Sequence, residues 1–568
     1  MLRAVSRGLA ARASATPLGG GESSARFLPA RVWRPHGETV RTASADATAS
    51  SSADGPAMPG WMGRPATDAR ADDEDEYFPA RTPADDDRAH FREGPSVAFW
   101  NTWRFDESDR ARGVRSILEQ IAAATVTPFD ARYWAYHIFR SSWFLGQGAA
   151  GLLASAALGP GAVGNPLSGD GGVRAGVAAG ARLFAEAVQV YAQDLAHVNA
   201  GTYRAPYDMT ELRHRQYDPL FVAKKTARFI SEASSTLRKN ARARADPDAD
   251  PNATKVWMDS PMYPDYYLKT FHWQTDGWFS RRSAEVYEVS TETLFLGRQD
   301  AMQRTALVPL SEWTRETRAA PDGKGTKLLE LACGTGRFLT FVRDNYPKMD
   351  VTGLDLSPFY LAEARENAEY WEKLRGEGTA ARTDPVSVVV DAARRAGGLA
   401  RAAGVPLPPF PAAARAETET KTETETGAAT TTGSCDFVQA NAESIPFPEE
   451  TFDAVTCVYL LHELPPAARA AVAKEAARVL KPGGVLVLAD SIQLGDRPHV
   501  DRHLGRFGDF NEPYYRSYIR EELVALFGPD GAGLEPWTKE LCSSTKVLSF
   551  RKPARAREES EGNVNPAP

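Results

Sequence analysis

The stretch that decides the fold is Leu328-Leu-Glu-Leu-Ala-Cys-Gly-Thr-Gly-Arg-Phe-Leu339. An apolar run leads into Gly334-Thr335-Gly336, and the apolar residues that follow recur at helical spacing. Glycines let the backbone turn tightly and approach a ligand, and the N-terminus of the next helix favours a carboxylate or phosphate. The pattern therefore predicts a strand, a ligand-binding turn and a helix within an α/β fold.

A second apolar run, Val351-Thr-Gly-Leu-Asp355, ends in an acid 21 residues after Gly334. An acid at this place can accept hydrogen bonds from both hydroxyls of a ribose. A dinucleotide-binding domain would need a third glycine in a G-x-G-x-x-G pattern, and this chain has Leu339 there. The sequence thus predicts a ribose-binding acid and disfavours a dinucleotide.

Glu330-Leu-Ala-Cys-Gly-Thr-Gly336 resembles motif I of the class I S-adenosylmethionine-dependent methyltransferases. Four further stretches resemble later motifs of that family and follow in the same order. They are Ser357-Pro-Phe-Tyr-Leu361, Gln439-Ala-Asn-Ala-Glu-Ser-Ile-Pro-Phe-Pro448, Thr451-Phe-Asp-Ala-Val455 and Arg478-Val-Leu-Lys-Pro-Gly-Gly-Val-Leu-Val487. The ubiquinone/menaquinone-biosynthesis-like methyltransferases, of the type 11/25 kind, are the most similar members. The resemblance covers about 326–390 and 434–552, roughly a third of the chain.

The resemblance implies a Rossmann-like, seven-stranded α/β sandwich with S-adenosyl-L-methionine as cofactor. Its last two strands would form an antiparallel hairpin, Trp537 to Cys542 and Lys546 to Arg551. The implied cofactor contacts are Glu330, Gly334, Thr335 and Gly336 at the methionine end, Asp355 at the ribose, Leu356, Asn441 and Ala442 at the adenine, and Tyr459 near the methyl group. The family often has Asp where Asn441 stands, but an Asn amide oxygen can also accept a hydrogen bond.

Two candidate catalytic residues, His462 and Glu463, follow the strand that ends near Tyr459. Ligands sit at the carboxyl ends of strands in open α/β sheets. An unperturbed His has a pKa suited to a general base, and Glu463 could orient it or act itself. This pair is not a zinc-protease motif, because Pro465 and Pro466 break the helix and the second His is missing.

We expect no metal site, since His499, Asp501 and His503 converge in neither regular geometry. Aromatic residues gather in Phe271 to Phe279, expected to form a lid, and in Phe507 to Tyr518, expected to line the acceptor pocket. Aromatic walls favour an apolar or aromatic small-molecule acceptor, such as a prenylquinone or lipid, over a charged one.

The sequence predicts a mostly helical, aromatic-rich N-terminal domain over residues 90–315. Its helices are expected at Val173 to Val198, Leu220 to Leu237 and Ser283 to Ala306, from apolar residues at helical spacing. Residues 143–164 carry no charge. The glycines and Pro160 in this run argue against a membrane span and favour a buried helix or peripheral membrane contact.

Outside these domains the composition is polar or biased. The first 45 residues hold seven arginines and no lysine, so we expect a transit peptide or disordered segment over 1–58. An acidic linker should follow over 59–89, and the methyltransferase domain should span 320–552 with a disordered insertion at 376–433 and a tail at 553–568. The basic start, with Arg3, Arg7 and Arg12, favours a mitochondrion, whereas the hydroxyl-rich run from Val40 to Ser52 favours a chloroplast. We expect a chloroplast, with a mitochondrion as the alternative. Tyr266-Tyr-Leu-Lys-Thr-Phe-His-Trp-Gln-Thr-Asp-Gly-Trp-Phe279 resembles cyanobacterial and plastid-type methyltransferase-like proteins, which also favours the plastid.

Charge and cysteine usage limit the other functions. Lys and Arg total 67 against 74 Asp and Glu, a net charge of −7, so we expect no nucleic-acid partner. Four cysteines without a CxxC pair argue against a disulfide scaffold or structural zinc. Two alternatives stay open: an RNA or protein methyltransferase, and a non-catalytic assembly protein that only binds the cofactor.

Overall fold

The computed structural model describes residues 81–105, 110–157, 172–210, 215, 218–245, 260–268, 276–378, 432–505 and 512–555. All of them belong to one compact unit, Ala45–Pro568. The predicted transit peptide, most of the acidic linker, nearly all of the insertion and the end of the tail lie outside the described residues.

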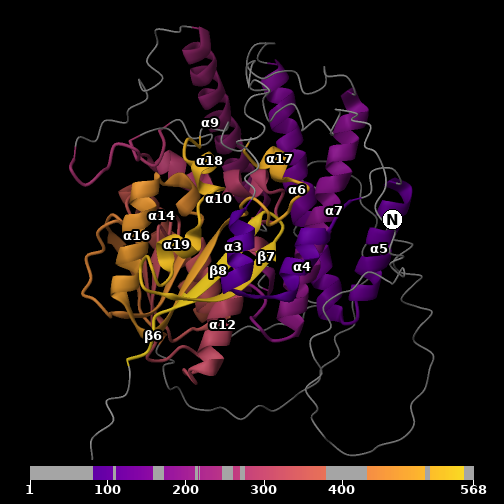
Figure 1. The fold of residues 1–568 in the computed structure, drawn as a ribbon. Coiled ribbons are helices and arrows are strands. Elements are labelled where there is room, and N and C mark those ends of the chain that lie inside the picture. The colour runs from indigo at the N-terminus through magenta and orange to yellow at the C-terminus, as the bar shows by residue number, and fades with distance from the viewer. Residues whose placement is uncertain are drawn as a thin grey trace, which may run out of the picture. The chain divides into compact units, whose positions relative to one another are not determined.

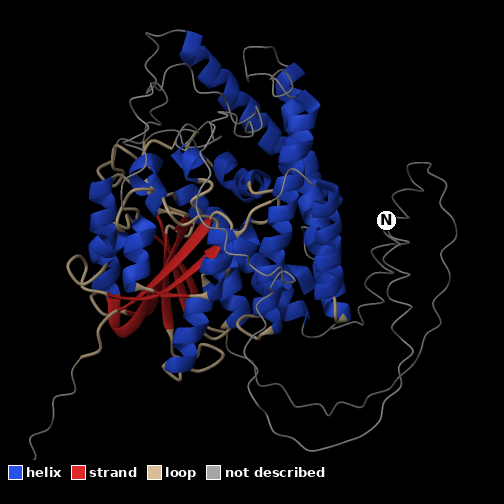
Figure 2. Ribbon diagram, turned by 45° about the vertical axis from the view of Figure 1, so that its right-hand side comes forward, coloured by secondary structure: helices blue, strands red, loops and turns tan. Residues whose placement is uncertain are grey.

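An eight-stranded sheet forms the centre of this unit (Figures 1 and 2). Its strand order is β1-β7-β8-β6-β5-β2-β3-β4. In chain order the strands are β1 (Arg92–Glu93), β2 (Lys327–Leu331), β3 (Asp350–Asp355), β4 (Cys435–Gln439), β5 (Phe452–Val458), β6 (Leu480–Ser491), β7 (Glu535–Cys542) and β8 (Thr545–Arg551). The predicted seven strands and the hairpin are confirmed: β8 pairs antiparallel with both β6 and β7, and the other neighbours are parallel. β1 is an additional edge strand that pairs parallel with β7.

Helices precede the sheet in the chain and also cover both of its faces. They are α3 (Pro83–His90), α4 (Pro95–Thr102), α5 (Arg110–Ala124), α6 (Pro128–Ala157), α7 (Gly172–Asn199), α8 (Tyr207–Thr210), α9 (Pro219–Ala245), α10 (Arg281–Leu294), α11 (Gln299–Arg304), α12 (Leu307–Glu316), α13 (Arg337–Asn345), α14 (Pro358–Gly378), η4 (Leu461–Glu463), α16 (Pro466–Val479), α17 (Asp501–Leu504), α18 (Tyr515–Tyr518) and α19 (Leu523–Phe527). The helices predicted at Val173 and Leu220 are confirmed as α7 and α9.

The alternating side chains of each parallel strand serve two separate cores, as expected for a sheet covered on both faces. Leu328 of β2 packs with α12 and α13 in one cluster of buried residues. Its neighbour Leu329 points to the other face and packs with α16 and α19. Trp100 of α4 and Val188 of α7 belong to that second cluster too, so the helical region and the sheet share one hydrophobic core. The domain boundaries at 315 and 320 stay predictions.

The single helix predicted from Ser283 to Ala306 is wrong, because the chain breaks between α10 and α11. Leu296 and Gly297 both have positive φ, and the Gly297 N–H donates to the carbonyl of Glu292 at 2.7 Å. This is the hydrogen-bond pattern of a Schellman C-cap. Gly297 also lies close to α6, since a Cβ there would be 3.2 Å from the Ser141 nitrogen. Apolar residues continue at helical spacing through the break, so their spacing did not indicate that the helix ends there.

The acidic linker predicted over 59–89 is wrong for its last residues, which form α3 and lie against the sheet. Asp87 is buried and accepts from the ammonium groups of Lys539, at 3.0 Å, and Lys546, at 2.8 Å. Asp496 pairs with the same two lysines. A run of acids usually indicates solvent exposure, but here one of them neutralises buried cations contributed by residues far along the chain.

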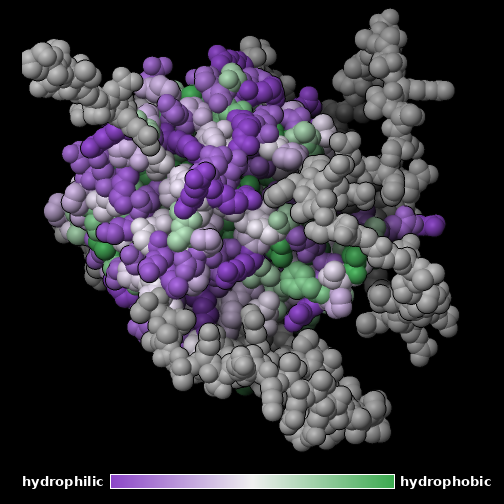
Figure 3. Space-filling model, turned by 90° about the horizontal axis from the view of Figure 1, so that it is seen from below, coloured by the Kyte–Doolittle hydropathy of each residue, from purple (hydrophilic) through white to green (hydrophobic). Residues whose placement is uncertain are grey.

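No helix of the described residues is long and apolar enough to cross a membrane. In α6, Phe139 is 64% exposed, and Trp143 and Leu145 are also exposed. Figure 3 shows a mainly hydrophilic face on which hydrophobic areas are small and scattered. The membrane contact predicted for 143–164 stays a prediction, and residues 158–164 lie outside the described part.

Candidate functional site

The strand order reverses between β2 and β5, since β3 and β4 follow on one side of β2 and β6 lies on the other side of β5. Ligands of open α/β sheets bind in the crevice at such a point, outside the carboxyl ends of the strands. The structure has a pocket there. Helices α9 and α10, from the helical region, lie over the same end of the sheet (Figure 1).

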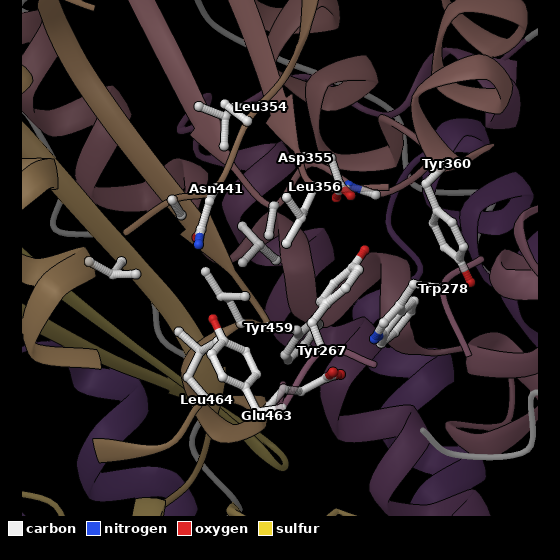
Figure 4. Close-up of a pocket in the computed structure, with 18 of the residues that line it drawn as sticks. Tyr267, Trp278, Leu354, Asp355, Leu356, Tyr360, Asn441, Tyr459, Glu463 and Leu464 are labelled. Carbon is white, nitrogen blue, oxygen red and sulfur yellow. The ribbon is translucent and has the colours of Figure 1, made fainter. Parts of the chain in front are cut away.

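The pocket brings together residues from both parts of the chain (Figure 4). Its lining is Tyr266, Tyr267, Trp278, Tyr287, Ala332, Gly334, Leu354, Asp355, Leu356, Tyr360, Ala440, Asn441, Ala442, Val458, Tyr459, Leu460, Glu463, Leu464 and Val472. Seven predicted site residues are among them: Gly334, Asp355, Leu356, Asn441, Ala442, Tyr459 and Glu463. The lining does not include Glu330, Thr335, Gly336 or His462.

The two glycines of the turn do different things. Gly334 has φ +55°, and the nearest atoms that a Cβ would meet are on Tyr287 and Tyr360, at 3.8 and 4.0 Å. Gly336 has φ +75° and packs instead against Ala364 and Phe437. Only Gly334 faces the pocket, while Gly336 turns the chain into α13. The predicted ligand contact at Gly336 stays a prediction.

Thr335 points away from the pocket, toward α10. Its hydroxyl donates to Glu288 Oε1 at 2.9 Å, and its carbonyl accepts from Asn367 Nδ2 at 3.0 Å. Asn367 also donates to Glu288 Oε1, at 3.2 Å. The glycine turn is therefore bonded directly to a helix that precedes the methyltransferase domain.

Asp355 stands at the end of β3 and is held by backbone donors. Its Oδ2 accepts from the Gly334 N–H and its Oδ1 from the Ser357 N–H, both at 2.8 Å. Burial raises the pKa of Asp355 to about 6, against the lowering effect of these donors. Each carboxylate oxygen keeps a lone pair for a ligand hydroxyl.

Glu330 lies on β2 beneath the pocket. It is buried, and its Oε2 has no hydrogen-bond partner among the described residues. Burial, and then the nearby Asp355 charge, raise the pKa of the Glu330 carboxyl well above its usual range. This shift favours the neutral acid, which can donate as well as accept a hydrogen bond.

Asn441 begins the turn that follows β4, and its side-chain amide is already engaged. Its Oδ1 accepts from the Glu443 N–H at 2.9 Å, and its Nδ2 donates to Glu443 Oε1 at 3.2 Å. Tyr266 donates to the same Glu443 oxygen at 2.7 Å. One lone pair of the Asn441 oxygen remains for a ligand amino group.

Tyr459 follows β5 with φ +56°, in the left-handed region that costs a non-glycine residue free energy. Its hydroxyl bonds the Thr545 hydroxyl at 2.6 Å, and its ring stacks on Phe295 at 6.4 Å between centroids. These contacts fix the ring as one wall of the pocket. Strain of this kind is concentrated at functional sites.

His462 does not suit the predicted role of general base. Its Nδ1 lies 2.6 Å from Asp490 Oδ1. Although burial opposes its charge, the Asp490 carboxylate raises the pKa of His462 to about 9. The ring is therefore cationic at neutral pH and packs against Tyr515 and Tyr518 rather than lining the pocket. The sequence placed His462 correctly at the strand end but could not show Asp490 beside it.

Glu463 is the predicted catalytic residue that the structure does bring to the pocket. Its side chain extends toward Trp278 (Figure 4). The Oε1 atom lies 3.8 Å from His462 Nε2. The Glu463 carboxylate thus reaches the pocket, and the His462 imidazolium lies behind it, on the side away from the pocket.

Sequence reasoning missed the aromatic residue that α10 contributes, Tyr287, because only apolar spacing was used to choose the inward face. Tyr266, Tyr267 and Trp278 belong to the aromatic block noted in the sequence, but Phe271 and Trp273 lie outside the described residues. Tyr515 and Tyr518, expected at the acceptor, surround His462 instead. No local signal shows which of many aromatic residues face a pocket.

The pocket fits a nucleoside that carries a charged amino-acid tail. Gly334 leaves open space where a side chain would project, and Asp355 has the acceptor capacity that a ribose needs. The orphaned Glu330 oxygen below provides a further polar group. These features agree with the cofactor that the sequence motifs imply.

Comparisons with known proteins agree with this geometry. Residues 328–391 and 389–488 match two families described as methyltransferase domains. An uncharacterized methyltransferase, YcgJ of Bacillus subtilis, is 36% identical over 89 residues, which are 16% of this chain and 33% of the relative. A ubiquinone/menaquinone biosynthesis C-methyltransferase of Marinomonas sp. is 43% identical over 58 residues, 10% of this chain and 22% of the relative. The chain thus spans a third or less of these curated relatives.

Among solved structures, the PH0226 protein from Pyrococcus horikoshii is 16% identical with a TM-score of 0.25, covering 44% of this chain and 90% of that one. A putative methyltransferase from Bacillus halodurans is 17% identical with a TM-score of 0.26, covering 43% and 100%. The sheet order, the site and the matched families define residues 328–488 as a class I methyltransferase domain of the S-adenosylmethionine-dependent type. Within that class, the local similarity includes ubiquinone/menaquinone C-methyltransferases.

Proposed function

We propose that the protein is an S-adenosylmethionine-dependent methyltransferase that modifies a small molecule with an apolar or aromatic body. The observation that carries the proposal is the pocket at the strand-order reversal. There Gly334, Asp355, Asn441 and Tyr459, from four separate motifs, line one space.

Each of these residues has a distinct task in binding. Asp355 accepts hydrogen bonds from the ribose hydroxyls, and Leu356 and Ala442 pack on the two sides of the adenine. The Asn441 oxygen accepts from the adenine amino group through its remaining lone pair. Gly334 lets the backbone approach the amino-acid end.

When bound, the cofactor supplies a methyl group on a positively charged sulfur. The protein has to hold the acceptor in line with that carbon and exclude water. Tyr459 and Leu464 form the wall beside it (Figure 4). Glu463 is placed to take the proton that the acceptor releases as its new bond to carbon forms and the carbon–sulfur bond breaks. His462, held by Asp490, positions Glu463 from behind.

The lining indicates the kind of acceptor. Val458, Leu460, Leu464 and the rings of Tyr266 and Tyr459 present a mainly apolar surface. A prenylated quinone, a phenol or a similar ring compound would bury its body against it. Proteins and RNA would need a broad docking surface as well as this pocket.

Calorimetric titration of S-adenosylmethionine and S-adenosylhomocysteine into the full chain tests the proposal. We expect micromolar binding of both ligands, and at least a tenfold loss in Asp355→Ala. Glu366→Ala is a matched control, since this acid lies on the exposed side of α14, where it pairs with Arg281. No binding to the wild-type protein would refute the proposal and favour an assembly role.

An acceptor screen then separates the substrate classes. Quinols, phenols, amines, RNA and protein extracts would be incubated with a cofactor carrying a labelled methyl group. Label in a small lipophilic product, lost in Glu463→Gln, is the expected result. Label in RNA or protein alone would support the macromolecular alternative.

We also propose that the protein is delivered to a plastid. The arginine-rich, lysine-free composition of the first 45 residues supports an organelle transit peptide, and the hydroxyl-rich run from Val40 to Ser52 favours a plastid. A fusion of residues 1–58 to a fluorescent protein, imaged with plastid and mitochondrial markers, tests this. Cytosolic fluorescence would contradict both organelles.

A further inference from the structure

Aromatic rings from two parts of the chain meet at the glycine turn. Trp278 and Tyr287 precede the methyltransferase domain, and Tyr360 belongs to α14. The ring centroids of Trp278 and Tyr287 are 5.9 Å apart, and each is 5.3 Å from Tyr360. All three line the pocket, and we call them the aromatic triad. The Tyr287 and Tyr360 rings are the atoms nearest to the open side of Gly334.

Hydrogen bonds tie these rings to the cofactor loops. The Trp278 carbonyl accepts from the Ser357 hydroxyl, and Ser357 in turn donates its N–H to Asp355. Glu288, the residue after Tyr287, accepts from the Thr335 hydroxyl. The triad is therefore built into the donor side of the pocket, and its position does not depend on an acceptor.

The ionisable side chains that line the pocket around the triad are acidic. Among the described residues that line the pocket, Asp355 and Glu463 carry carboxyl groups, and there is no Lys, Arg or His. Glu463 extends toward Trp278 (Figure 4). Electron-rich ring faces and carboxylates both attract a cation. A buried site of this composition selects for a positive ligand group.

We propose that the triad recognises the positive sulfonium of the methyl donor and so distinguishes the donor from its demethylated product. This inference rests on the proposed function. The donor and the product share the nucleoside and the amino-acid tail, and they differ in the charge on sulfur. The rings attract the positive sulfur before methyl transfer, and this attraction is absent once the sulfur is neutral. The triad therefore favours binding of the donor over binding of the product.

Titration of both ligands into the same samples tests the triad. We expect Tyr287→Leu and Trp278→Leu in the full chain to lose roughly tenfold in affinity for S-adenosylmethionine, the scale of one desolvated cation–π contact. Affinity for S-adenosylhomocysteine should change by less than about threefold. Tyr287→Phe and Trp278→Phe keep a ring and should keep the preference for the donor.

The control is Phe359→Leu, which removes a ring that belongs to a neighbouring hydrophobic cluster but does not itself line the pocket. Because both ligands meet the same sample, partial unfolding lowers the stoichiometry for both and leaves the ratio of affinities unchanged. Equal weakening of the two ligands in the leucine variants, or no weakening, overturns the proposal. Absence of binding to the wild-type protein instead refutes the proposed function, and this inference with it.

Discussion

Asp355 is the residue whose ionisation should have the most direct effect on a measured cofactor-binding curve. The sequence identified it from its distance to Gly334, and the structure places it in the pocket, held by two backbone donors. What the sequence could not give is its ionisation, because that depends on burial by segments distant in the chain. The raised pKa, about 6, lies close to the pH of ordinary assays.

We therefore predict that cofactor binding weakens in mild acid. A carboxylate that accepts hydrogen bonds from ribose must be ionised, so affinity should rise with pH through about 6 and level off above 7. Between pH 7 and pH 5 the affinity for S-adenosylhomocysteine should fall roughly tenfold. Calorimetry at a series of pH values measures this.

Asp355→Asn provides the control for the pH series. It should bind more weakly than the wild type at pH 7, and its affinity should not change with pH. A wild-type curve that is flat between pH 5 and pH 7 would mean that Asp355 does not accept from the ligand.

His462 gives a second residue-scale prediction, on stability. Its pKa in the folded state, about 9, lies above the unfolded value near 6.5. The pair with Asp490 thus contributes stability that is fully present below pH 6.5 and is lost as pH rises through 9. We expect the thermal midpoint to fall between pH 6.5 and pH 9.5, with a free-energy change of roughly 3 kcal/mol.

His462→Gln should start from a lower midpoint and show a smaller fall over the same pH range. Differential scanning calorimetry of the two proteins at both pH values separates this effect from general alkaline destabilisation. An identical fall in both proteins would contradict the assigned pair.

At the scale of elements, the strands of the methyltransferase domain were predictable because each βα unit carries its own local motif. The break between α10 and α11 was not, since a C-cap with Leu296 at positive φ leaves the apolar spacing intact. The sequence also did not show which face of α10 lies toward the pocket. It is fixed by the bond from Thr335 to Glu288, which joins positions 47 residues apart.

A buried ionic network holds these elements together. Arg337, the first residue of α13, donates to both oxygens of Asp300 and to Asp208. Arg140 of α6 donates to Asp300 and to Glu292 of α10. One residue after Gly336, Arg337 thus anchors the glycine turn directly to α8 and α11, and through Asp300 and Arg140 to α6 and α10.

We predict that Arg337→Gln destabilises the protein by about 3–5 kcal/mol, because Asp208 and Asp300 would keep their buried charges without this partner. Cofactor affinity should also fall, since the glycine turn loses its anchor. Chemical denaturation and calorimetry measure the two effects. Arg315→Gln, an exposed arginine on α12, should stay within about 0.5 kcal/mol of the wild type. Equal stability of both variants would show that the network contributes little.

At the scale of the whole molecule, the sequence suggested two separate domains, whereas the described residues share a core. Near residue 320 the sequence changes to apolar strands that alternate with helices, and the structure confirms that the βα units begin there. The contacts that cross it cannot be seen in the sequence. Asp87 and Lys546 are 459 positions apart and meet in the interior, and no local pattern relates an acidic segment to two lysines in a distant hairpin.

This arrangement predicts that the methyltransferase domain does not fold alone. A fragment of residues 320–555 would lose Asp87, leaving Asp496 as the one carboxylate that pairs with Lys539 and Lys546 among the described residues. It would also lose β1 from the sheet edge and expose the core residues that contact Trp100. One broken buried pair costs about 3–5 kcal/mol, a large part of the roughly 5–15 kcal/mol that keeps a domain folded.

We expect the fragment 320–555 to melt without a cooperative transition and to bind a hydrophobic dye, while residues 81–555 melt as the full chain does. Asp87→Asn in the full chain tests the ionic part alone, because it removes one charge and keeps the core. It should lower the thermal midpoint with the cooperative transition retained. A fragment that melts cooperatively at the wild-type temperature would show that the helical region is an accessory domain, and Trp278 and Tyr287 of the aromatic triad would then come from outside the folding unit.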